Sequence, residues 1–310
     1  MAKAYKEIAN INDLTHDDWL EIRKDYIGGS DAGAICGVNP WASPASVWLQ
    51  KQEDSKPIQD NERMRIGRDL EDYVAKRFQE ATGKKVRRNN FMMVSKEYPF
   101  MMANIDREIV GERAILECKT TGSYSKEDWS NGNIPDHYYT QVQHYLAVLG
   151  YQTAYIACLI GNESFVWYEV PRDEEYIEAM IEIEGKFYID NMLGEEMPYP
   201  DGTSAYSEAL KNRFSQSNGE TVDIPELDSI LQDYLIAKEE TQKAKDKEEL
   251  LRQQLQYQMG ENEQANVNER VITWKTYTRN NFNKKQFEKD YPEIAEKYYT
   301  QSDYKRFSVK

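Results

Sequence analysis

The stretch that decides the fold reads Ile105-Asp106, then ten residues, then Glu117-Cys118-Lys119. An apolar run precedes each part, at 100–103 and 114–116, and Gly111 lies between them as a turn signal. This pattern predicts a β-hairpin. Because residues alternate faces along a strand, Glu117 and Lys119 share one face and Cys118 points to the other.

Such a hairpin would bring two carboxylates and one amine together. Carboxylate oxygens are ligands that Mg²⁺ prefers, and a metal ion held this way can activate a water molecule against a phosphodiester. The triplet alone also allows a plainer interpretation, a solvated hairpin with a chance Glu-x-Lys pair. Its neighbours in the sequence favour the metal site.

Composition limits the class of protein. The chain has 310 residues and a formal net charge of −15, which argues against a surface coated with basic charge for non-specific DNA binding. Its three cysteines are widely spaced and form neither a disulfide framework nor a zinc pattern, and they are too few to ligate an iron–sulfur cluster. We see no apolar run of membrane-spanning length and no secretion signal, so we expect the protein to work in a reducing cytosol.

Basic residues gather just upstream of the hairpin. They are Lys84, Lys85, Arg87, Arg88 and Lys96. They are candidates for a locally basic DNA channel, and the alternative is a solvated turn.

The order of predicted elements describes a mixed α+β domain around a central sheet. We expect strands near 85–94, 100–105, 107–110, 113–119, 153–160 and 164–170. Helices are predicted over 62–82, which carries Glu71 beside its apolar stripe, over 135–149, which carries Gln141 between Tyr138 and Tyr145, and over 173–190.

The pattern changes after a Pro-, Gly-, Ser- and Asn-rich stretch at 191–221, which reads as a linker. A helix over 225–259 carries a weak heptad seam, and 270–277 reads as a strand. The seam fits an intermolecular coiled coil or a helix packed on its own domain. We therefore predict a core over residues 1–205 and a C-terminal helical, coiled-coil extension with a small α/β tail over 206–310.

Several segments in series resemble the YqaJ-type viral recombinase family, which includes lambda-type exonucleases. The segments are Arg23, Ile27–Ala32, Gly67–Glu71, Asp106, Glu117–Lys119 and Gln141–Tyr145. The resemblance covers about residues 15–190 and implies a restriction-endonuclease-like PD-(D/E)xK core, with a central mixed β-sheet flanked by helices. One departure is Ile105, which stands where the motif usually has proline.

The resemblance also implies roles. Asp106 and Glu117 would be metal ligands, joined by Glu71 and the backbone carbonyl of Cys118. Lys119 would orient or help to deprotonate the attacking water, and Gln141 and Gln143 would border the site. The implied cofactor is Mg²⁺, with Mn²⁺ as a substitute.

Arg23 and Ser30 match the family's pocket for a terminal 5′-phosphate. A glycine-rich turn entering a helix offers free backbone amides, and arginine binds phosphate through two N–H groups. The commoner use of a serine there is as a helix N-cap. Both interpretations stay open from the sequence.

The function that the resemblance implies is a Mg²⁺-dependent 5′-to-3′ exonuclease on linear double-stranded DNA, which leaves 3′ single-stranded tails for phage-type recombination. Expected partners are DNA ends, a single-strand annealing protein and two further copies of the chain in a homotrimer. The expected location is the cytoplasm of a bacterial host cell, with no membrane association. The alternatives are a structure-specific endonuclease or nickase on the same core, and a catalytically inert DNA-binding scaffold.

Overall fold

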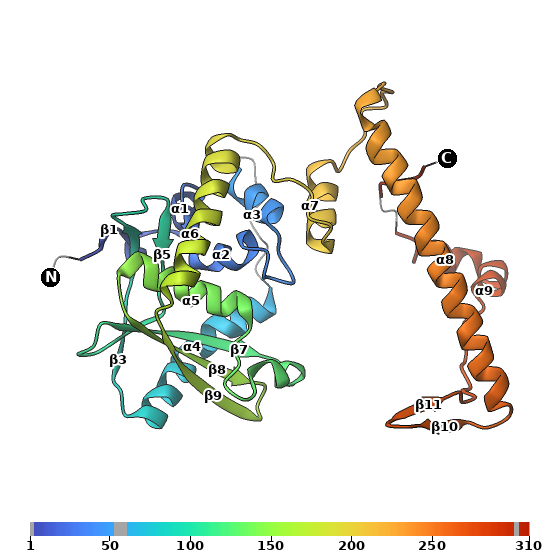
Figure 1. The fold of residues 1–310 in the computed structure, drawn as a ribbon, viewed down its shortest axis with the longest axis horizontal. Coiled ribbons are helices and arrows are strands. Elements are labelled where there is room, and N and C mark those ends of the chain that lie inside the picture. The colour runs from blue at the N-terminus through green and yellow to red at the C-terminus, as the bar shows by residue number, and fades with distance from the viewer. Residues whose placement is uncertain (1–2, 53–60, 301–303, 310) are drawn as a thin grey trace. The chain divides into compact units, whose positions relative to one another are not determined.

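The computed structural model describes residues 3–52, 61–300 and 304–309. It divides into two compact units, Met1–Ser215 and Gln216–Lys310 (Figure 1). This division falls later than the predicted one after residue 205, because helix α7 (Ser204–Arg213) lies within the expected linker and packs on the first unit. Tyr206 and Ala209 of α7 are buried against Ala45 of helix α3 (Pro44–Lys51).

A five-stranded mixed sheet forms the centre of the first unit. Its order is β3 (Val86–Arg88), β6 (Arg107–Ile109), β7 (Ala114–Thr121), β8 (Thr153–Ile160) and β9 (Ser164–Pro171). Strands β7 and β8 are parallel, and the other pairs are antiparallel. The predicted hairpin is confirmed, since Arg107 pairs with Leu116 and Gly111 adopts a φ of +87° in the turn.

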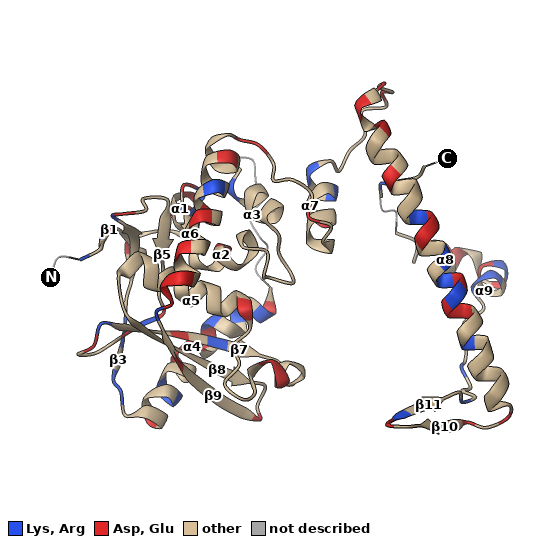
Figure 2. Ribbon diagram, in the orientation of Figure 1, with Lys and Arg blue, Asp and Glu red and all other residues tan. Residues whose placement is uncertain are grey.

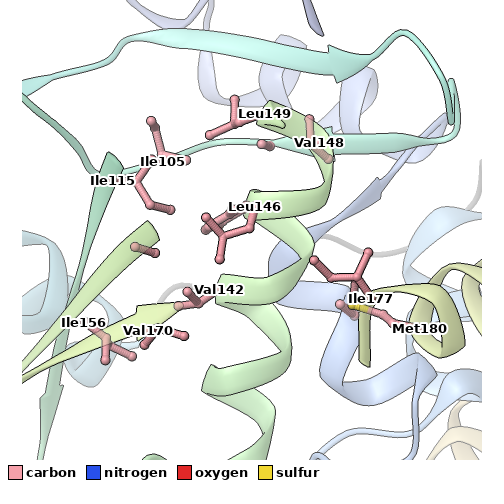
Figure 3. Close-up of a cluster of buried hydrophobic side chains, with 14 of the residues drawn as sticks. Ile105, Ile115, Val142, Leu146, Val148, Leu149, Ile156, Val170, Ile177 and Met180 are labelled. Atoms are coloured by element: carbon pink, nitrogen blue, oxygen red, sulfur yellow. The ribbon is translucent and has the colours of Figure 1, made fainter. Parts of the chain in front are cut away.

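Two helices cover the two faces of this sheet (Figure 1). Helix α5 (Asp136–Leu149) packs on the face that carries Ile115 and Ile156, and Figure 3 shows this core. Helix α4 (Glu62–Thr82) packs on the face that carries Leu116. Alternation along β7 therefore assigns odd-numbered side chains to the α5 side, which includes Glu117 and Lys119.

A four-stranded sheet, in the order β1-β4-β5-β2, completes the first unit. Its strands are β1 (Tyr5–Asn10), β4 (Phe91–Ser95), β5 (Met101–Ala103) and β2 (Ile27–Gly28). The sequence did not predict β1. The single strand predicted over 85–94 is instead two strands in different sheets, because the extended structure is interrupted at Asn89 and Asn90.

Further helices surround these sheets. They are α1 (His16–Lys24), α2 (Gly29–Ile35) and α6 (Glu174–Phe187), with the 3₁₀ helices η1 (Ile11–Asp13), η2 (Ser123–Ser125) and η3 (Glu127–Trp129) and the π-helix η4 (Tyr188–Leu193). The buried His144 of α5 binds Glu184 of α6 at 2.9 Å and approaches the carbonyl of Met102 at 3.0 Å, so it ties α5 to both α6 and β5.

The second unit is built around the long helix α8 (Asp228–Met259), which confirms the predicted helix. The other elements are η5 (Pro225–Leu227), β10 (Gln264–Val267), β11 (Arg270–Thr273), α9 (Lys284–Asp290) and α10 (Pro292–Glu296). Ile230, Leu251 and Leu255 of the heptad seam are exposed, so this unit's described residues do not bury it. The intermolecular coiled coil stays a prediction. None of the helices described is long and apolar enough to cross a membrane.

Candidate active site

The hairpin brings its charged groups together within the five-stranded sheet, where β6 begins beside β7. Asp106 lies just before β6, and its Oδ2 accepts a hydrogen bond of 2.7 Å from the backbone N–H of Cys118 on β7. Glu117 and Lys119 point to the α5 face, where Lys119 Nζ lies 2.7 Å from Glu117 Oε1. The local β-pairing therefore positions all three predicted residues.

Helix α5 supplies a bridge between the acid and the amine. The Gln141 amide nitrogen donates to Glu117 Oε1 at 2.8 Å and lies 3.0 Å from the Tyr145 hydroxyl, while its Oε1 accepts from Lys119 Nζ at 2.9 Å. Gln141 is buried, so these bonds satisfy an amide that would otherwise be costly to bury. We conclude that Gln141 positions both Glu117 and Lys119.

The two carboxylates lie in a dry, negatively charged environment. Loss of surrounding water raises the pKa of Asp106 well above its ordinary value, and the charges of Glu117 and Glu71 raise it further. Burial also raises the pKa of Glu117, against the opposing effect of Lys119. Burial opposes the charge of Lys119, yet Glu117 and Asp106 raise its pKa. One amine thus balances two acids only in part.

This arrangement fits a hard cation. The Oε2 atom of Glu117 is buried and has no hydrogen-bond partner, which leaves an acceptor oxygen beside the Asp106 carboxylate. Buried acceptors without partners are costly, and a cation would satisfy this one. Among the residues described, no three His, Cys, Asp or Glu side chains are grouped closely enough to hold a metal. The fit rests on Asp106 and Glu117, with the Cys118 carbonyl as a further candidate oxygen.

Glu71, the expected third carboxylate, is paired with Arg107 and lies near enough for its charge to act on Asp106. Arg107 directly follows Asp106, is buried, and pairs through Nη1 with Glu71 while donating to the Asp106 carbonyl at 2.6 Å. Its Nη2 lies 2.6 Å from Asp72. Arg107 was not predicted from the sequence, although a strand that begins with an arginine directly after Asp106 was a signal that acidic partners lie nearby.

The structure also brings Arg23 and Ser30 together, the two residues of the predicted phosphate pocket. Arg23 Nη2 donates to Ser30 Oγ at 2.8 Å and lies 3.4 Å from Asp31, and the Trp19 ring lies under its guanidinium at 4.7 Å. The N-cap interpretation of Ser30 is wrong, because Gly28 is the N-cap of α2 and Asp31 accepts its N–H at 3.0 Å.

A buried lysine sets the charge of this pocket. Lys51 Nζ lies 2.7 Å from Asp31. Although burial opposes it, the charges of Lys51 and Arg23 hold the pKa of Asp31 at about 2. Two cations therefore share one carboxylate, which leaves this end of the pocket suited to an anion.

Gln143 does not join the cluster, which corrects the expectation that it borders the site. Its amide donates to the Pro171 carbonyl at 2.9 Å and accepts from the Asp173 N–H at 3.1 Å. It therefore fastens α5 to the junction between β9 and α6. The physical reason is helical geometry, since residues two apart point in nearly opposite directions.

The predicted basic channel is also largely neutralised. Lys84 pairs with Glu112 at 2.7 Å, Arg87 with Glu108 at 2.7 Å and Arg88 with Asp72 at 2.6 Å, while Lys85 is exposed. Figure 2 shows basic residues on α4 and β3 and acidic residues along α6. The cluster upstream of the hairpin is thus mainly a set of surface ion pairs, and it contributes less net positive charge than the sequence indicated.

The fold and the cluster of Asp106, Glu117, Lys119 and Gln141 define a restriction-endonuclease-like nuclease core. The sequence model of the YqaJ-like viral recombinase domain matches residues 18–152. The chain is 38% identical over 315 residues to the uncharacterized protein YqaJ of Bacillus subtilis (strain 168), covering 100% of this chain and 98% of that protein. It therefore belongs to the YqaJ-like viral recombinase family.

Solved structures confirm the predicted fold. An alkaline exonuclease (LHK-Exo) from Laribacter hongkongensis is 17% identical, with a TM-score of 0.50 that covers 64% of this chain and 98% of the exonuclease. The same enzyme in complex with dAMP gives 18% identity and the same TM-score and coverage. At this identity the likeness bears on the fold, and the site rests on the geometry above.

Proposed function

We propose that this chain is a Mg²⁺-dependent exonuclease that digests one strand of linear double-stranded DNA from its 5′ end and leaves a 3′ single-stranded tail. The observation that carries the proposal is the buried Glu117–Lys119 pair, bridged by Gln141 beside Asp106, with one carboxylate oxygen left without a partner. Membership of the viral recombinase family supports it, as does the fold shared with the alkaline exonuclease from Laribacter hongkongensis.

Each side chain has a definable task in this reaction. Mg²⁺, with Mn²⁺ as a substitute, would supply Lewis acidity to the phosphate and lower the pKa of a water molecule. Asp106 and Glu117 would hold the ion. Lys119 Nζ has three N–H donors, of which two point to Glu117 and Gln141. The third can orient the attacking water or offset the charge that grows on the phosphate oxygens.

The 5′ direction rests on the proximity of the Arg23 pocket to this cluster. Tyr145 connects them, because its hydroxyl lies 3.0 Å from the Gln141 amide and its ring fills the space beside Gly29. A Cβ added at Gly29 would lie 2.4 Å from that ring. A terminal phosphate held by Arg23 and Ser30 would therefore lie near the hydrolytic groups, as an enzyme that starts from a 5′ end requires.

The decisive experiment is digestion of linear duplexes labelled separately at each 5′ and 3′ end, with and without Mg²⁺. We expect early release of 5′ label as mononucleotide, no release without the metal, and no cutting of closed circular plasmid. Nicking of supercoiled plasmid would favour the endonuclease alternative. An inactive wild-type chain in Mg²⁺ and in Mn²⁺ would favour the inert scaffold.

The proposal extends to assembly and partners. A ring-shaped homotrimer that encloses DNA would explain processive digestion, and the 3′ tail is the substrate of a single-strand annealing protein in a bacterial host. Light scattering should then give a mass near three times 36.3 kDa. A monomer at the concentrations that support processive digestion would refute the ring.

A further inference from the structure

A groove beside the catalytic cluster has unusual exposed aromatic walls. It has a volume of about 610 Å³ and lies between the start of α4, the end of β7 and the start of α5. We call it the aromatic groove, and its principal side chains are Trp41, Arg63, Ile66, Thr120, Tyr124 and Tyr138. Trp41 and Tyr124 are 71% and 73% exposed, which is high for such large rings at the surface of a folded unit.

The aromatic groove adjoins the hydrolytic groups at Tyr138, which lines the groove and lies against Lys119. Thr120, which lines the groove, directly follows Lys119 on β7 and points to the α4 side of the sheet. The ring of Tyr138 lies 4.7 Å from the Lys119 amine, so it forms a wall between the cluster and the groove. A strand that passes the Tyr138 ring from the cluster would reach the groove.

Both exposed rings are held in place. The Tyr124 ring packs on Gly122, where an added Cβ would lie 2.4 Å from a ring carbon. Trp41 meets the ring of His137 edge to face at 5.2 Å, and the His137 ring in turn lies 4.0 Å from that of Tyr138. The rings thus present fixed faces to solvent, which lowers the entropy cost of binding a flat partner.

The position of the groove along α5 indicates its occupant. Tyr138, Gln141 and Tyr145 follow one another along the helix, and the outer two are about 10 Å apart along its axis. Tyr145 faces the Arg23 pocket and Tyr138 faces the groove. A strand with its 5′-phosphate at Arg23 and its scissile phosphate at the cluster would continue into the groove.

We propose that the aromatic groove binds the unpaired bases of the digested strand, on the 3′ side of the scissile phosphate, by stacking on Trp41 and Tyr124; this rests on the proposed 5′-to-3′ activity. In an intact duplex the base faces are stacked on one another, so only a strand that has left the duplex can offer them to these rings. Base–aromatic stacking is tolerant of sequence, as a general exonuclease needs. Arg63 places one cation at the groove for the accompanying phosphate.

The test measures binding without metal, so that no digestion occurs. The probe is a 5′-phosphorylated duplex whose first four nucleotides are mismatched, compared with the same duplex lacking the bases of nucleotides two to four. We expect Trp41→Ala and Tyr124→Ala each to weaken binding of the first probe by roughly tenfold and to leave binding of the abasic probe unchanged. Gly122→Ala, which displaces the Tyr124 ring, should behave like Tyr124→Ala.

Three control variants sharpen this test. Trp41→Phe and Tyr124→Phe keep a flat ring and should retain most of the affinity. Tyr199→Ala removes a ring that is 88% exposed elsewhere on the same unit and should change nothing.

Equal affinities of wild type, Trp41→Ala and Tyr124→Ala for the mismatched probe would overturn the proposal. Sensitivity to the bases of a 3′ overhang, rather than to those of the 5′ strand, would also overturn it, because the occupant would then be the other strand. Digestion of the same duplex in Mg²⁺ measures the proposed activity independently of binding. A base-dependent binding loss in a chain that digests nothing would therefore refute the activity and not the stacking site.

Discussion

Replacing Gln141 with leucine tests how the catalytic groups are positioned. Leucine has nearly the volume of glutamine but removes the amide bridge to Glu117, Lys119 and the Tyr145 hydroxyl. Hydrogen bonds to charged groups contribute about 1.5–3 kcal/mol each and a neutral one about 0.5–1.5 kcal/mol. These ranges add to about 3.5–7.5 kcal/mol, and because Glu117 and Lys119 keep their own contact at 2.7 Å, we expect a loss at the low end, about 3–4 kcal/mol in the free energy of unfolding.

The same substitution should slow digestion even under conditions where the variant is fully folded. Lys119 would lose one of its two fixed acceptors and Glu117 one of its two donors. Loss of groups that orient metal-site residues typically costs roughly ten- to a hundredfold in activity. The rate of mononucleotide release at saturating Mg²⁺ measures this effect, at a temperature where both proteins are fully folded.

Gln143→Leu is the matched control, because it lies on the same helix and is also buried. It removes two hydrogen bonds to backbone groups of Pro171 and Asp173, for an expected loss of about 1–3 kcal/mol in the free energy of unfolding. Urea unfolding should show that both variants are destabilised, but only Gln141→Leu should slow digestion. Equal rates for the two variants would refute the assigned role of Gln141.

Three further outcomes follow from the site and the core. Lys119→Met should lower digestion by about a hundredfold or more with folding retained, measured as nucleotide release; near wild-type rates would rule out its role. Arg23→Ala should bring the ratio of rates on phosphorylated and hydroxyl 5′ ends close to one, and an unchanged ratio would exclude the phosphate pocket. Burial opposes the charge of His144, but Glu184 raises its pKa above the ordinary value. Its stabilising contribution is therefore full below about pH 6.5 and is lost as pH rises through the raised pKa. Urea unfolding should give a lower free energy of unfolding at about pH 9 than at about pH 6, and this difference should be smaller in Glu184→Gln. The same pH dependence in both proteins would contradict the assigned pair.

Much of the first unit was predictable because local periodicity sets it. The apolar runs around Gly111 specify the hairpin, and the twofold repeat of a strand places Glu117 and Lys119 on one face. The long helices were equally clear from their apolar stripes. Helix α7 was missed because a Pro-, Gly- and Ser-rich context hid a short helix that depends on packing against α3.

Some errors could have been avoided from the sequence itself. Gln141 and Gln143 are two residues apart on one helix, so they could not both border the same site. Other errors could not have been avoided. The ion pairs of Arg87 and Arg88 with Glu108 and Asp72 join residues 16 to 21 positions apart, and only the folded chain brings them together.

The sequence alone determined the hairpin, the shared face of Glu117 and Lys119 and the helices on either side, because these depend on backbone periodicity over a few residues. The tertiary structure decided which partners those side chains meet. It assigned Glu71 to Arg107, left one oxygen of Glu117 without a partner, and brought Trp41, Tyr124 and Tyr138 to a single groove. Such contacts depend on how helices pack across a sheet, where a rotation of one helix changes every neighbour, and no local pattern in the sequence records that choice.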